Sequence, residues 1–118
     1  MRLTASERLS IDLAARFVRL EPLLAENLDD TGHVLNYLFL ADVARWMAQA
    51  VRDPTLRPGD VTQLLDFLES SFSEGSFEVR NLISIGFVQM LPSTGEPGAE
   101  LRNMLGPLLA AEYKDVNW

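Results

Sequence analysis

The residue types that most often carry out chemistry in proteins are almost absent from this chain. It contains one histidine, His33, and no cysteine. Thiolate nucleophiles, disulfides and cysteine metal sites are therefore excluded. A zinc site with one histidine would take its other ligands from carboxylates, which is uncommon. No carboxylate lies at ligand spacing from His33 in the sequence, so we predict a surface or helix-capping histidine, with no metal site and no cofactor site.

The sequence motifs of common catalytic sites are also missing. The nucleophile elbow G-x-S-x-G, the phosphate loop G-x-x-x-x-G-K-[ST] and the dinucleotide motif G-x-G-x-x-G do not occur. The pair Asp29-Asp30 resembles a fragment of a calcium loop but lacks the rest of that pattern. The 17 acidic residues could supply a carboxylate pair for acid–base catalysis in any fold. We therefore predict no catalytic residues, and a carboxylate-based enzyme is only an alternative.

One segment combines acidic and aromatic side chains. Four acids fall within 13 residues, with Arg80 as the only basic residue beside them. The two aromatic rings lie at the edges of apolar stripes, where they can be partly exposed. Acids around aromatic anchors are typical of a surface that binds a basic protein. The alternative is a solvated helix face with both rings in the core. The predicted partner-binding residues are Asp66, Phe67, Glu69, Glu74, Phe77 and Glu78.

The elements that would position this segment are all helices. Apolar residues from Leu9 to Leu24 follow helical spacing, and the first helix begins at Thr4 or Ser6 in a capping-box pattern. Pro22 interrupts this stretch and begins a second short piece over residues 22–28. After a polar turn, a second long helix is expected over residues 33–51. It is apolar on nearly all sides, which predicts a buried, central helix.

Three further helices are predicted in the second half of the chain. One begins in a capping box at Asp60 and ends at Gly75. Ser76 caps the next, residues 76–91, which is the second central helix and forms a helical hairpin with its predecessor. The last covers residues 99–113, with a kink or restart at Gly106-Pro107 and an irregular tail over residues 114–118.

These elements define the predicted fold class, which is all-α. No period-two alternation is sustained, so no sheet is expected. Residues 1–118 are predicted to form a single domain, a compact bundle of five to six helices. An arrangement of HEAT-like helical hairpins is the alternative.

The charge balance restricts the partners. The chain has 10 basic and 17 acidic residues, a formal net charge of −7, and 47% hydrophobic residues. Nucleic acids and anionic membranes are disfavoured, because both attract clustered Lys and Arg. A basic protein is the favoured partner class, unless the charge serves solubility alone. The lack of cysteine, of a signal-peptide core and of a long apolar run predicts a cytoplasmic protein.

The second half of the chain also carries a resemblance to known proteins. Over residues 60–113 it resembles a group of small helical bacterial proteins associated with polymorphic-toxin immunity genes. The resemblance implies a cytosolic protein that binds and blocks a cognate toxin, and it assigns no functional residue. The segments that carry it are Phe67-Leu68-Glu69-Ser70-Ser71-Phe72-Ser73-Glu74-Gly75, Glu78-Val79-Arg80-Asn81-Leu82-Ile83-Ser84-Ile85-Gly86-Phe87, Leu91-Pro92 and Leu105-Gly106-Pro107-Leu108.

Three functions are therefore compatible with the sequence. The first is a non-enzymatic binding module, an immunity protein that covers the active site of a basic toxin. The second is a structural or adaptor domain that presents a helical groove to a peptide. The third is the carboxylate-based enzyme, which would need a deep pocket with two acids of raised pKa. Either a monomer or a homodimer is compatible with each of them.

Overall fold

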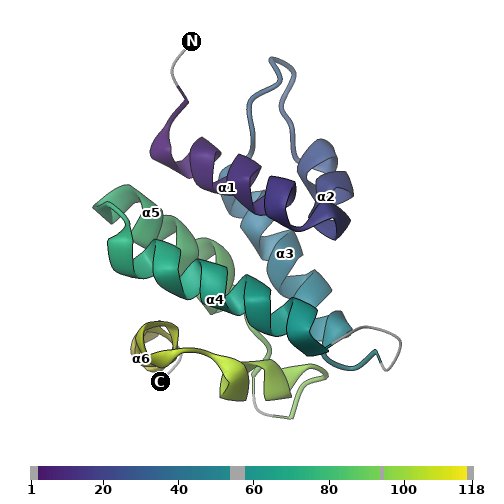
Figure 1. The fold of residues 1–118 in the computed structure, drawn as a ribbon, viewed down its shortest axis with the longest axis vertical. Helices are drawn as coiled ribbons and strands as arrows, with labels where there is room; N and C mark the ends of the chain where they lie inside the picture. Colours follow the sequence, from purple (N-terminus) through teal and green to yellow (C-terminus); the bar gives the residue numbers. More distant parts are fainter. Residues whose placement is uncertain (1–2, 54–57, 94, 117–118) are drawn as a thin grey trace.

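The computed structural model describes residues 3–53, 58–93 and 95–116 (Figure 1). Helix α1 (Ala5–Arg16) begins at Thr4, whose hydroxyl Oγ1 accepts a hydrogen bond from the Glu7 amide at 3.1 Å. This confirms Thr4, and not Ser6, as the N-cap residue. The helix ends at Phe17, where the backbone turns to an extended conformation. The expected continuous helix up to Pro22 is therefore wrong, because the break lies five residues earlier.

A short helical piece and a hairpin turn connect α1 to the next long helix. The piece consists of a 3₁₀ turn, η1 (Val18–Leu20), and α2 (Glu21–Glu26), which has Pro22 in its first turn as predicted. Residues 27–35 then form a hairpin, in which Leu28 and Val34 make an isolated antiparallel bridge. The Leu35 amide donates to the Asn27 carbonyl at 2.7 Å. Because residues up to Leu35 belong to this hairpin, the next helix begins three residues later than predicted.

That helix, α3 (Asn36–Ala50), is buried at the centre of the molecule, as its apolar circumference predicts. Phe39, Leu40, Val43 and Met47 have no exposed surface. Helix α4 (Pro58–Glu74) begins two residues before the predicted capping box and ends where predicted, just before Gly75. A Cβ atom on Gly75 would lie 2.5 Å from the Ser71 carbonyl oxygen, so the tight turn after α4 needs a glycine.

The second central helix is not regular. It consists of α5 (Phe77–Leu82), a π-helical segment η2 (Ile83–Phe87) and a 3₁₀ turn η3 (Val88–Met90). We call residues 77–90 the composite helix. It forms the predicted hairpin with α4 (Figure 1) and also packs against α3. A Cβ atom on Gly86 would lie 3.1 Å from Cβ of Leu40, so this glycine permits the close approach of the two central helices.

The C-terminal part of the described chain contains a 3₁₀ helix, η4 (Ala99–Met104), and α6 (Pro107–Val116). The restart at Pro107 confirms the predicted interruption. The tail predicted to be irregular from residue 114 is helical through Val116, and residues 117–118 lie outside the described residues.

All of these helices contribute to one hydrophobic core, and the all-α prediction is confirmed. Counting residues 18–26 and 77–90 as one helix each gives about seven helices, against the five to six expected. The radius of gyration of the Cα atoms is 13.6 Å. A single compact domain of this length has a value of about 13.5 Å, so the helices form a compact globule. Among the described residues, no helix is long and apolar enough to cross a membrane.

Candidate protein-binding face

Two of the six predicted partner-binding residues are used inside the fold, and Glu69 of α4 is the first. Its carboxylate accepts hydrogen bonds from the amides of Leu108 at 2.8 Å and Leu109 at 3.0 Å. These amides lie in the first turn of α6, where a helix leaves N–H groups without partners of its own. Glu69 therefore caps α6, and its negative charge also suits the positive end of the helix dipole.

Glu78 has the same role for α1. Its Oε2 accepts a hydrogen bond from the Ser6 amide at 2.8 Å, across 72 positions of sequence. The hydrogen bonds from the Ser6 hydroxyl and the Ser6 amide lower the pKa of this carboxyl from its usual 4.5. Together with Thr4, Glu78 satisfies free amides in the first turn of α1. The prediction that Glu69 and Glu78 bind a partner therefore competes with a structural role for each carboxylate.

The other two acids, Asp66 and Glu74, are exposed on α4. They are eight residues apart, which places them on the same face of the helix, with Ser70 between them. Within the described part of the chain, no arginine or lysine nitrogen lies within 4.0 Å of either carboxylate. These two charges are therefore available to a partner.

Arg80, the basic residue closest to the acidic segment in sequence, points elsewhere. Its Nε donates to the Phe72 carbonyl at 3.1 Å, and its terminal nitrogen donates to the Ser73 carbonyl at 3.3 Å. Its guanidinium also lies 6.0 Å from the centre of the Phe72 ring. Arg80 thus caps the C-terminal end of α4, where a cation is favoured, and forms no ion pair with Asp66 or Glu74.

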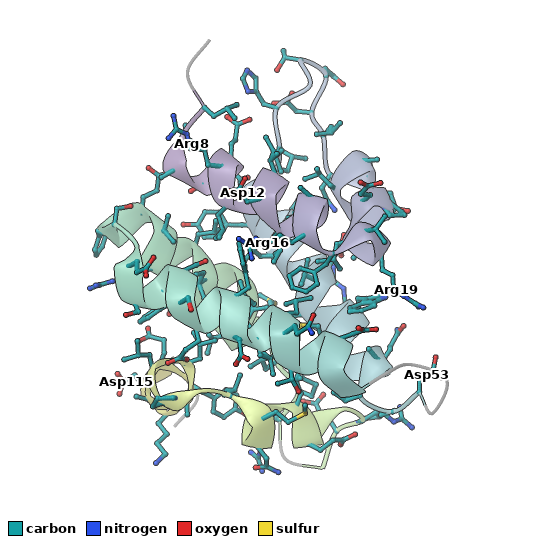
Figure 2. The ribbon with its side chains drawn as sticks, viewed as in Figure 1. Arg8, Asp12, Arg16, Arg19, Asp53 and Asp115 are labelled. Atoms are coloured by element: carbon teal, nitrogen blue, oxygen red, sulfur yellow. The ribbon has the colours of Figure 1, made fainter. Side chains whose placement is uncertain are left out.

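A groove runs between the end of α1 and the exposed side of α4. Its volume is about 680 Å³, and it brings together residues that lie far apart in the sequence. The guanidinium of Arg16 lies 5.0 Å from the centre of the Phe67 ring, a cation–π distance, and Figure 2 shows Arg16 between the two helices. The residues that line the groove are Arg16, Phe17, Gln63, Asp66, Phe67, Ser70, Ser71 and Glu74.

The two aromatic residues of the predicted site differ in their environment. Phe67 is half-buried, and its ring meets that of Phe17 edge-on, with ring centres 6.2 Å apart and planes at 79°. Phe77, the first residue of α5, is 84% exposed. Burial inside the fold therefore does not explain why a phenylalanine stands at position 77. We call the groove with Asp66, Phe67 and Glu74, together with Phe77 three residues after the end of α4, the α4 face.

Sequence reasoning missed the contribution of α1 to this face. Arg16 is the last residue of α1, and Phe17 is its C-cap residue. No local sequence pattern connects these two residues to α4, about 50 positions later. The only sequence signal was that Phe17 belongs to an apolar stripe and so must pack against another element. Its packing partner, the Phe67 ring, could not be identified in this way.

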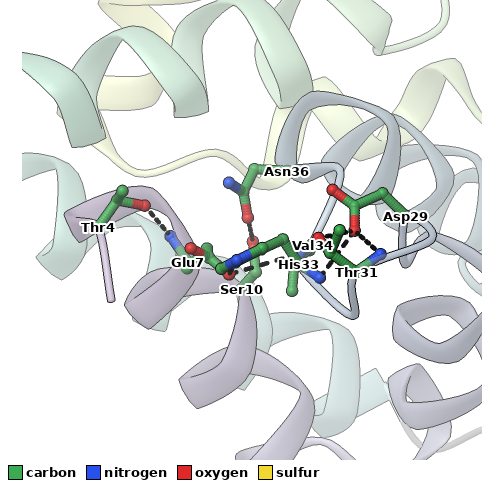
Figure 3. A network of polar contacts seen from close by, with 8 residues as sticks. All are labelled: Thr4, Glu7, Ser10, Asp29, Thr31, His33, Val34 and Asn36. Carbon is green, nitrogen blue, oxygen red and sulfur yellow. Dashed lines mark hydrogen bonds and ion pairs between the residues drawn. The ribbon is translucent and has the colours of Figure 1, made fainter. Parts of the chain in front are cut away.

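His33 lies in a separate polar network (Figure 3). Its Nδ1 is 3.1 Å from Oε2 of Glu7, a carboxylate of α1 that is 26 positions away. Asp29 Oδ1 accepts hydrogen bonds from the Thr31 hydroxyl, the Thr31 amide and the His33 amide. The Thr31 hydroxyl is the largest of the causes that lower the pKa of Asp29. The network fastens the 27–35 hairpin to α1.

This network also includes Asp29-Asp30, the pair that resembles a fragment of a calcium loop. Asp29, the first residue of the acidic pair Asp29-Asp30, organises its own turn, because its Oδ1 accepts three hydrogen bonds from the protein. Among the residues that the structure describes, no group of three or more histidine, aspartate or glutamate side chains is arranged to hold a metal ion.

Comparisons with known proteins complete the description. No curated protein and no solved structure matches this chain. One family model does, and its match includes the whole segment 60–113 and nearly all of the fold described above. The chain belongs to the family of the domain of unknown function DUF7674, whose model matches residues 11–118.

Proposed function

We propose that this protein is a non-enzymatic binding module that neutralises a cognate toxin in the cytoplasm by covering a basic surface of that toxin with its α4 face. The supporting observation is that Asp66 and Glu74, two carboxylates with no ion pair among the described residues, line the groove, and that Phe77, three residues after the end of α4, is 84% exposed. Aromatic anchors supply much of the binding energy at protein interfaces. Complementary charge supplies the encounter rate and the specificity.

The overall charge favours a basic protein over nucleic acid or a membrane surface. A net charge of −7 repels phosphates and anionic lipids and attracts a cationic partner. Toxin domains that attack nucleic acid are often basic, and a basic toxin is the partner type that the resemblance over residues 60–113 implies. The mechanism is occlusion, because a rigid helix such as α4 can lie across a cleft without changing its own conformation.

A second candidate function rests on a different surface. A hollow of about 370 Å³ lies between α1 and α2, and its lining is apolar apart from Glu21. An adaptor domain could bind an apolar peptide there. The lining residues are Ile11, Ala14, Ala15, Glu21, Leu24, Ala25 and Leu28.

The enzyme alternative has less support. A general acid that works near neutral pH needs a carboxyl with a raised pKa. In the described part of the chain, the carboxyls of Asp29, Asp42 and Glu78 have a pKa that departs clearly from the usual value, and in each it is lowered. For Asp42 the main cause is a hydrogen bond from the Asn27 side chain at 2.8 Å. All three carboxyls fasten the fold.

Co-expression tests the proposal. The protein encoded by the adjacent gene is expressed in a bacterial host, where we expect it to arrest growth and the present chain to restore it. The variant D66K/E74K should lose this protection. A matched control, E26K/E100K, changes the net charge equally at two other exposed acids and should protect fully. Loss of protection by A15K, with D66K/E74K still active, would favour the adaptor hollow over the α4 face.

A further inference from the structure

We draw no further inference here: the strongest candidate, the cavity of about 190 Å³ beside Trp46 where α3 meets the end of α1 and the start of α4, shares Arg16, Phe17 and Gln63 with the groove of the α4 face and therefore belongs to the site already described.

Discussion

At the scale of single residues, the four acids of the acidic segment look alike in the sequence but have two different roles. Glu69 and Glu78 accept backbone hydrogen bonds at the starts of α6 and α1. Asp66 and Glu74 face solvent beside the groove. The two roles follow from geometry, because only Glu69 and Glu78 lie opposite the free first-turn amides of another helix. Substitutions should therefore separate stability from binding.

Glu78 gives a prediction about acid stability. Its pKa is lowered in the folded chain, so its stabilising effect is complete above the usual value of 4.5 and is lost as the pH falls through the folded-state pKa. E78Q removes this titration. We expect its melting temperature to be below that of the natural chain at neutral pH and to decline less steeply between about pH 5 and pH 2.5. E74Q, which changes an exposed acid, should decline in parallel with the natural chain. A parallel decline for E78Q would contradict the cap.

At the scale of elements, helical periodicity predicts most of the architecture. It identifies α3 as buried and α4 as amphipathic, and the turn residues Gly75 and Ser76 give the hairpin correctly. The break at Phe17 was missed because neither Phe17 nor its sequence neighbours are proline or glycine, so no helix-breaking residue marks the change to extended backbone. The π-helical segment within the composite helix was missed because Ile83 to Phe87 read as an ordinary apolar run.

The caps that Glu78 and Glu69 provide for α1 and α6 across long sequence separations could not be predicted either. The Glu69 carboxylate meets the Leu108 amide 39 positions later, and the Glu78 carboxylate meets the Ser6 amide 72 positions earlier. Spacing rules apply within one helix, and such contacts depend on how helices are placed in space. The acidic segment was therefore recognised as unusual, but its division into two acids that cap other helices and two that do not required the fold.

The cap at α6 leads to a prediction about that helix. E69A removes the acceptor for two amides and should lower the free energy of unfolding by about 0.5–2 kcal/mol, the usual cost of losing an N-cap. Hydrogen exchange at the amides of Leu108 and Leu109 should become faster. D66A, one turn earlier and exposed, is the matched control and should leave both quantities unchanged. Equal stabilities of E69A and the natural chain would show that the cap contributes nothing.

At the scale of the whole molecule, the protein is an acidic globule with a groove between the end of α1 and the exposed side of α4. The α4 face combines the negative charge of Asp66 and Glu74 with the exposed ring of Phe77. The groove on the α4 face depends on residues from α1 and α4, which the fold brings together around one core. Function is therefore expected to depend on the intact globule, since neither helix alone would form the groove.

The central claim is that the α4 face is the binding surface, and calorimetric titration of the purified chain with the protein encoded by the adjacent gene tests it most directly. We predict that the natural chain and E26K/E100K bind with the same affinity. F77A and D66K/E74K should each bind at least about thirtyfold more weakly, with unchanged melting temperatures. Equal affinity for D66K/E74K and the natural chain, or no binding by the natural chain, would contradict the claim.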